Sequence, residues 1–249
     1  MEQLISRGPE EAPADVAVTL RSLTARRVKR EPMAYILGER EFWGLPFKVT
    51  PDVLVPRPDS ETMIDAALSL LPDRTRSWRL LDLGTGSGCL LLTLLREFPN
   101  ATGVGLDASP AALAVARANA DALSVAGRAT LVAGDWRDPD WTAALPDAPF
   151  DLVVSNPPYI EAATIDDLMP EVARFEPRLA LDGGPDGLAA YRRIAAAGRE
   201  IVTRGGFFAV EGGERQAVDI ADIFSAAGLV PLPPWKDMGG IERVIAARH

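Results

Sequence analysis

Asn156-Pro157-Pro158-Tyr159 places an amide, two prolines and an aromatic hydroxyl directly after an apolar run. That run, Phe150–Ser155, predicts a buried strand, and open α/β sheets bind ligands at the carboxyl ends of their strands. The Asn156 side-chain carbonyl and the Pro157 backbone carbonyl can accept both N–H bonds of a planar amide or aromatic amine. Such a nitrogen is a poor nucleophile because its lone pair is delocalised. The motif therefore predicts a site that aims this lone pair at an electrophile and stabilises the charge that develops.

Each residue of this motif has an expected role. The two prolines fix φ and bring no N–H group that could compete for the carbonyls. Tyr159 is expected to lie against the flat acceptor group. We predict Asn156, Pro157 and Tyr159 as catalytic residues, and all four residues, Pro158 included, as substrate-binding residues. A proline-rich strand exit without chemistry is the alternative. No dedicated base is required, since the methylated nitrogen is acidic enough to lose its proton to water.

A glycine-rich turn upstream predicts the electrophile. The stretch LLDLGTGSG ends a buried strand at Leu83 and then opens a helix. Its glycines allow a tight turn and a close approach to a ligand. A dinucleotide-binding turn would need glycine where Cys89 stands, so S-adenosylmethionine is the better-fitting cofactor. The predicted contacts in this turn are Gly84, Thr85, Gly86, Ser87 and Gly88.

Further cofactor contacts are expected on the following strands. Asp107 closes the next strand, about 20 residues on, where an acid can accept hydrogen bonds from both ribose hydroxyls. Asp135 and Trp136 suit the adenine amine and the adenine ring face, with an ordinary half-buried aromatic as the alternative for Trp136. The segment Arg57–Asp59 is expected beside this pocket, contributing to substrate entry, with a simple linker turn as the alternative.

The elements that must position these residues follow from Trp78 onward. β-rich runs (RLLDLG, TGVGLDA, ATLVAGD, FDLVVSN, GGFFAVEGG) alternate with helical patterns at 88–97, 110–125, near 187–203 and near 214–227. This alternation predicts a doubly wound α/β sheet. At the end, GLVPLPPWKD and IERVIAARH predict two strands joined by a turn at Gly239-Gly240. A terminal antiparallel hairpin on a parallel sheet is typical of the class I, Rossmann-like methyltransferase fold.

Two smaller elements precede the sheet. Residues 14–31 place Val16, Leu20, Leu23 and Val28 at roughly helical spacing among basic residues, which predicts one basic amphipathic helix. Its charges form either a solvated face or a partner-binding face. A β-hairpin is expected between about Glu41 and Val55. The predicted domains are a short N-terminal helical segment (1–38), a β-hairpin linker (39–58) and a catalytic domain (59–249).

Composition narrows the class of protein. The 249 residues are 47% hydrophobic and 24% charged, as expected of a soluble globular protein. No apolar run approaches the ~20 residues of a membrane span, and the N-terminus does not resemble a secretory signal, so a cytoplasmic location is expected. One cysteine and a single terminal histidine argue against disulfides, a metal site and a histidine-based triad. The net charge of −9 disfavours a dedicated nucleic-acid binder.

Taken in order, these motifs resemble those of the release factor glutamine methyltransferases, the HemK family. The resemblance runs from about Glu31 to the C-terminus, and its most specific parts are the RPDSE segment and RFEPRLALDGGPDGLAAYRRI. It implies methyl transfer from S-adenosylmethionine to the side-chain amide of the Gly-Gly-Gln glutamine in class-1 peptide chain release factors, modulating translation termination. It also implies that Gly84–Gly88, Asp107, Trp136 and Asn156 contact the cofactor, and that Asn156–Tyr159 hold the glutamine.

One departure and two alternatives stand beside this resemblance. The family usually begins with a bundle of several helices that helps dock the release factor, whereas only 33 residues precede Ala34 here, enough for about one or two helices. A nucleic-acid methyltransferase acting on the adenine amine could use the same NPPY motif on a flipped base. A cofactor-binding regulator without catalysis is a third reading, which the intact NPPY disfavours.

Overall fold

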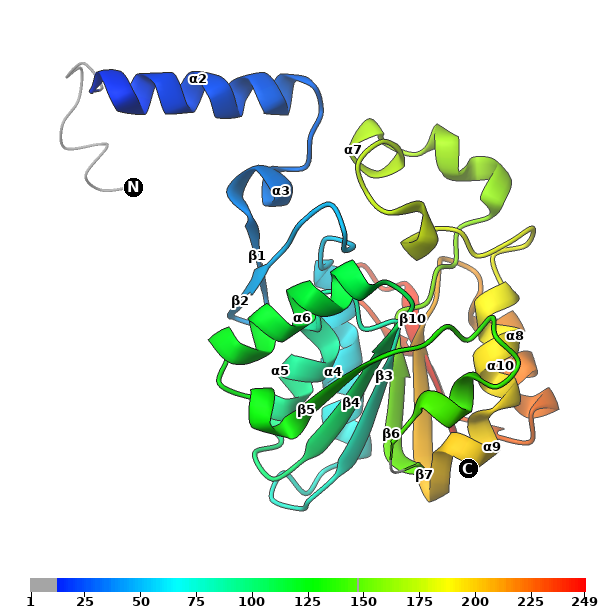
Figure 1. Cartoon of the computed structure of the whole chain (residues 1–249). Coiled ribbons are helices and arrows are strands. Elements are labelled where there is room, and N and C mark those ends of the chain that lie inside the picture. Colours follow the sequence, from blue (N-terminus) through cyan, green and yellow to red (C-terminus); the bar gives the residue numbers. More distant parts are fainter. Residues whose placement is uncertain (1–12, 147) are drawn as a thin grey trace.

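The computed structural model describes residues 13–146 and 148–249. Within them, an eight-stranded sheet has the order β5-β4-β3-β6-β7-β10-β8, and β9 also pairs with β10 (Figure 1). Strands β3 to β7 run parallel and β10 runs antiparallel to β7. The strands are β3 (Arg79–Leu83), β4 (Thr102–Asp107), β5 (Ala129–Ala133), β6 (Phe150–Ser155), β7 (Val202–Glu211), β8 (Val230–Pro231), β9 (Trp235–Lys236) and β10 (Glu242–Arg248). The predicted α/β sheet is confirmed.

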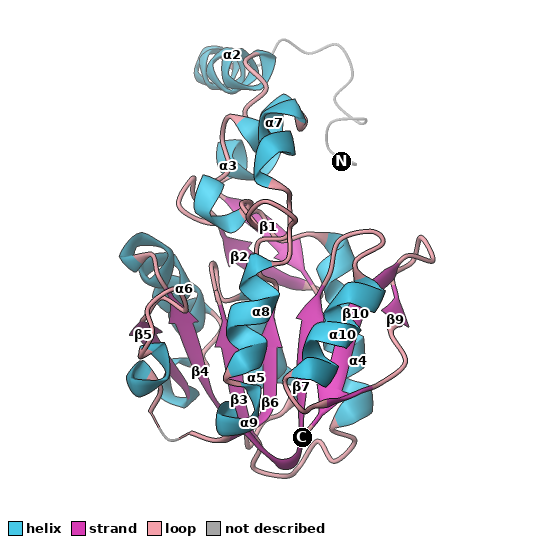
Figure 2. Cartoon of the chain, turned by 90° about the vertical axis from the view of Figure 1, so that its right-hand side faces the viewer, coloured by secondary structure: helices cyan, strands magenta, loops and turns pink. Residues whose placement is uncertain are grey.

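Helices cover both faces of this sheet (Figures 1 and 2). Strand residues alternate between the two cores, so Leu80 and Leu152 face one while Leu81 and Val153 face the other. The first face carries α4 (Glu61–Leu70), α5 (Cys89–Glu97) and α6 (Pro110–Ala122), and the second carries α8 (Ala189–Ala196), α9 (Gly198–Ile201) and α10 (Ala217–Ala226). The helix predicted near 187–203 is thus two shorter helices, and β7 begins before the predicted GGFF.

The hairpin before the sheet is shorter than predicted. Strands β1 (Glu39–Phe42) and β2 (Leu45–Lys48) pair through a turn at Trp43-Gly44, where both residues have positive φ. Phe42 and Phe47 are fully buried in the core beneath α4 and α5. Pairing ends at Lys48 because Pro51 follows in a turn, so the residues up to Val55 form a loop packed on α6 instead of a strand.

The N-terminal helix is confirmed, but its apolar face is not packed. Helix α2 (Ala14–Val28) has no buried residue, and Leu20 is 61% exposed. Arg27 and Arg30 instead pair with Glu171 of α7 (Pro170–Ala173), which lies near α2 and α3 (Met33–Leu37) in Figure 2. The first part of the predicted 1–38 segment lies outside the described residues. In the described ranges, no helix is long and apolar enough to cross a membrane.

The C-terminal hairpin is present with a break. The turn at Gly239-Gly240 joins β9 to β10 as predicted. The first strand is split into β8 and β9 because Pro233 and Pro234 lie between them and cannot donate ladder hydrogen bonds. Strand β10 lies between β7 and β8, so its residues 244–247 are buried on both faces.

Candidate active site

A cavity of about 670 Å³ opens at the carboxyl ends of β3, β4, β5 and β6. This volume lies within the range usual for cofactor sites. Most of the predicted residues line it: Gly84, Thr85, Gly86, Ser87, Asp107, Asp135, Trp136, Asn156 and Pro158. Gly88, Pro157 and Tyr159 are not among the lining residues. The fold therefore brings the predicted cofactor turn and the start of the acceptor motif to one cavity.

The glycine turn is held by the neighbouring strand and leaves no room for a side chain at Gly84. The backbone N–H groups of Gly84 and Thr85 both donate to the Leu106 carbonyl, at 2.8 and 3.0 Å. Gly84 has a φ of +74°, and a Cβ there would lie 2.9 Å from the Trp136 ring. Trp136 thus lies over the turn at the cavity wall. Gly88 instead caps the start of α5.

Asp107 is oriented by two backbone donors. Its Oδ2 accepts from the Gly86 N–H and its Oδ1 from the Ser109 N–H, both at 2.8 Å. Burial raises the pKa of this carboxyl, and the two hydrogen bonds oppose that rise. A carboxylate has about four acceptor positions, so this one retains two, as the predicted hydrogen bonds from the ribose hydroxyls require.

Asp135 is already engaged by Arg137. The guanidinium lies 2.5 Å from Oδ2, and its hydrogen bond is the main reason why the pKa of Asp135 is lowered. An adenine amine would have to share this carboxylate with Arg137. The predicted role of Asp135 would therefore place two donors in competition for one carboxylate.

Asp82 is a cavity residue that we did not single out from the sequence. It lies in β3, is 1% exposed, and accepts a 2.7 Å hydrogen bond from the Thr85 hydroxyl. Burial raises its pKa to about 7, and the charge of Asp107 adds to the rise. The sequence feature that could have identified Asp82 is an acid among the apolar residues of this strand. Asp82 and Asp107 both line the cavity. Two such carboxyls suit a ligand with positive charges, and S-adenosylmethionine carries a sulfonium and an ammonium group.

Two carbonyls of the acceptor motif, that of the Asn156 side chain and that of the Pro157 backbone, are the ones that the predicted grip requires. The Asn156 Nδ2 donates to the Ser60 hydroxyl oxygen at 3.2 Å. Across the described part of the chain, no N–H or O–H group donates to Asn156 Oδ1 or to the Pro157 carbonyl. Both acceptors that the predicted grip requires are therefore unused.

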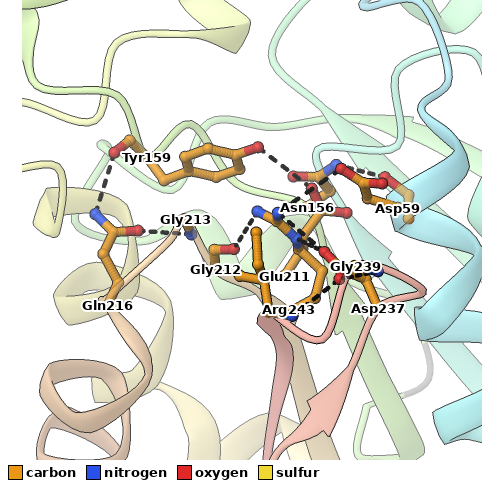
Figure 3. Close-up of polar contacts among 12 residues, drawn as sticks. Asp59, Asn156, Tyr159, Glu211, Gly212, Gly213, Gln216, Asp237, Gly239 and Arg243 are labelled. Carbon is orange, nitrogen blue, oxygen red and sulfur yellow. Dashed lines mark hydrogen bonds and ion pairs between the residues drawn. The ribbon is translucent and has the colours of Figure 1, made fainter.

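Tyr159 is not among the cavity-lining residues, and its hydroxyl and its carbonyl are both anchored by neighbouring side chains (Figure 3). Its hydroxyl donates to Glu211 Oε1 at 3.4 Å, and its carbonyl accepts from Gln216 Nε2 at 3.1 Å. Gly187 packs on the same carbonyl, because a Cβ there, at a φ of +71°, would lie 2.4 Å from the Tyr159 oxygen. These contacts explain why a glycine-rich segment follows the acceptor motif, and sequence reasoning missed them.

Arg57 lines the cavity, whereas Pro58 and Asp59 are not among its lining residues. The prediction that this segment lies beside the pocket is thus confirmed for Arg57.

Asn119 of α6 is another residue that sequence reasoning missed. It bonds both backbone groups of Lys48 and the Ser87 carbonyl, and so ties the hairpin to the cofactor turn.

Comparison with known proteins agrees with this geometry. Two family models match, the PrmC N-terminal domain over residues 1–38 and the methyltransferase small domain over residues 60–174. The release factor glutamine methyltransferase of Rhodospirillum rubrum is 48% identical over 241 residues, covering 97% of this chain and 70% of that protein. That of Caulobacter vibrioides is 45% identical over 243 residues, covering 98% and 82%.

A solved structure shares the fold alone. The hMettl16 catalytic domain, crystallised in complex with MAT2A 3'UTR hairpin 6, is 15% identical with a TM-score of 0.65, covering 87% of this chain and 79% of that one. Together with the strand order, this confirms the class I S-adenosylmethionine-dependent methyltransferase fold. The extent and identity of the two bacterial matches decide the narrower question: this chain belongs to the release factor glutamine methyltransferase family.

Proposed function

We propose that this protein transfers the methyl group of S-adenosylmethionine to the side-chain amide nitrogen of the Gly-Gly-Gln glutamine in class-1 peptide chain release factors, and so modulates translation termination. Family membership supports the reaction. The observation that carries the chemistry is the free Asn156 carbonyl beside a cavity walled by the glycine turn.

The proposed mechanism relies on positioning. When bound, S-adenosylmethionine supplies an electrophilic methyl group. Asn156 Oδ1 and the Pro157 carbonyl accept the two N–H bonds of the glutamine amide, which turns its lone pair toward that methyl group. The two carbonyls also stabilise the positive charge that develops on the nitrogen. The nitrogen then releases one proton to water.

The cofactor contacts belong to the same proposal. Gly84–Gly88 and Asp107 hold the amino-acid and ribose portions, with Trp136 against the adenine and Asn156 at the junction with the substrate. Pro158 lines the cavity and supports this placement. For Tyr159, we propose that the hydrogen bond from its hydroxyl to Glu211 holds the aromatic ring in place at the edge of the acceptor site. Residues 59–249 form the proposed catalytic domain, preceded by the hairpin (39–58) and the helical segment (1–38).

The proposed partner is a release factor and not a nucleic acid, and the proposed location is the cytoplasm, where translation occurs. The net charge of −9 supports a protein substrate, because it repels a phosphate backbone. The test offers radiolabelled cofactor with release factor, ribosomal protein and tRNA in separate reactions. Label in the release factor supports the proposal. Label in tRNA alone assigns the adenine-amine reaction instead.

A further inference from the structure

Glu211 is a buried acid directly behind the acceptor motif. It ends β7, one residue after Val210, which pairs with Ser155 of β6. The residue is 1% exposed, and its Oε1 accepts the Tyr159 hydroxyl at 3.4 Å (Figure 3). Its Oε2 is buried and has no partner of normal hydrogen-bond geometry within the described ranges. Glu211 is not among the residues that line the cavity, whereas Ser60 and Asn156 are.

Ser60 connects Glu211 to the acceptor motif. This residue ends the short helix Pro58–Ser60 and is 2% exposed. Its oxygen accepts the Asn156 Nδ2 at 3.2 Å. Burial raises the pKa of Glu211, and the Ser60 hydroxyl is the first of the groups that oppose this rise. A serine hydroxyl has a single proton. When that proton is directed at Glu211, the Ser60 oxygen can only accept a hydrogen bond from Asn156. Asn156 must then present its NH₂ group to Ser60, and its carbonyl points away from Ser60.

Charged and titratable groups from several elements surround Glu211. Arg243 of β10 is the nearby cation, although it bonds Asp237 at 3.1 Å and lies 3.7 Å from Asp59. The remaining titratable neighbours are Tyr159, Cys89 of α5 and Tyr191 of α8, whose hydroxyl donates to the Glu211 carbonyl at 2.8 Å. Arg243 favours the carboxylate, whereas burial and Asp59 oppose it.

We propose that Glu211 is a positioning residue of the acceptor site, whose carboxylate directs the Ser60 proton and thereby keeps the Asn156 carbonyl facing the substrate. The inference rests on the proposed function for its substrate but not for its geometry. A protonated Glu211 becomes a donor to Ser60, which frees the Ser60 proton for Asn156 and lets the amide turn. The pKa of Glu211 is raised to about 6 by burial. Turnover should therefore fall as the pH drops through about 6.

The kinetic test compares Glu211→Gln and Ser60→Ala with the exposed control Glu214→Gln on release factor methylation. We expect each of the first two to lower kcat about 10- to 100-fold, with KM for the cofactor within about twofold of wild type. Glu211→Gln should also lose the acidic fall near pH 6. Because both act through one contact, the double variant should lose no more than the worse single variant. An unchanged kcat in folded Glu211→Gln, or additive losses, would overturn the inference.

A second measurement separates this inference from the proposed function. The side-chain amide of Asn156, observed by ¹⁵N NMR in the protein without substrate, should shift in Glu211→Gln and Ser60→Ala but not in Glu214→Gln. An unchanged resonance in Glu211→Gln overturns the positioning role. If the shift occurs while the wild-type protein leaves release factor unmethylated, the positioning role stands and the proposed function fails.

Discussion

Arg57 Nη2 lies 2.7 Å from Glu176 Oε1, and the Glu176 side chain is 1% exposed. Arg57 precedes α4 and Glu176 follows α7, so this ion pair joins two segments far apart in the sequence. Burial raises the pKa of Glu176, and Arg57 opposes that rise. These are the RPDSE and RFEPRLAL segments that most specifically resemble the family. Their residues Arg57, Pro177 and Arg178 all line the cavity, so the pair holds one of its walls in place.

We expect Arg57→Ala to lower the free energy of unfolding by about 2–3 kcal/mol. The loss should fall below the ~3–5 kcal/mol of a fully buried pair, because the Arg57 side chain is 35% exposed. Urea denaturation measures it, and Arg57→Met with Glu176→Gln should recover most of it. Arg178→Ala, which breaks an exposed pair with Asp166, is the control and should cost below ~1 kcal/mol. Equal stability of Arg57→Ala and wild type would contradict a structural ion pair.

Asp107→Ala should weaken S-adenosylmethionine binding by about 10- to 100-fold, because it removes hydrogen bonds to a charged acceptor. Calorimetry on the folded variant measures the change. Asp121→Ala, on the exposed side of α6, is the matched control and should bind normally. Unchanged affinity in Asp107→Ala would remove Asp107 from the ribose site.

Cofactor affinity should rise with pH through about 7. Asp82 has a pKa of about 7 without ligand, and positive charges on the cofactor favour its ionised form, so binding releases a proton at lower pH. Calorimetry at pH 6 and pH 8 should give tighter binding at pH 8, by up to about tenfold, and Asp82→Asn should flatten the dependence. The same slope in Asp82→Asn and wild type would assign the effect to another group.

Glu211→Gln should be more stable than wild type at alkaline pH. The pKa of this buried acid is raised from 4.5 to about 6, so its contribution to stability is present below pH 4.5 and is lost as the pH rises through 6. The difference in unfolding free energy between variant and wild type should therefore grow by about 2 kcal/mol from pH 4.5 to pH 8. Denaturant titrations across this range test it, and a constant difference would show that Glu211 is not an unfavourably buried carboxylate.

The sequence predicted the parts of this protein that depend on local patterns. The alternation after Trp78 predicted the sheet, and the glycine turn at Gly84 predicted the place of the cavity. These predictions succeed because the hydrophobic period of the segments, the conformation of the turns and the order of the strands constrain one another. The hairpin limit at Lys48 and the broken strand before β10 were missed, although prolines marked both.

The supporting residues could not be predicted in the same way. Glu211, Ser60, Asn119 and Glu176 act through contacts with segments distant in the sequence, and a single chain offers no local sign of such pairing. Asp82 was the exception, since a carboxyl inside a buried strand is costly unless a ligand or donor compensates it.

Asn156→Ala should lower the turnover number about 10²- to 10³-fold, far more than it weakens cofactor binding, because the carbonyl matters most as charge builds on the nitrogen. Single-turnover kinetics and calorimetry separate the two effects. A loss of cofactor affinity that accounts for the whole rate loss would place Asn156 in cofactor binding alone.

Mass spectrometry of release factor treated with the enzyme and S-adenosylmethionine tests the central claim most directly. We expect the mass of one methyl group to be added to the side chain of the Gly-Gly-Gln glutamine, and no addition when that glutamine is replaced by glutamate, which offers neither N–H bonds for Asn156 and Pro157 nor a nitrogen to methylate. A release factor that stays unmodified under conditions where the enzyme methylates RNA would contradict the account.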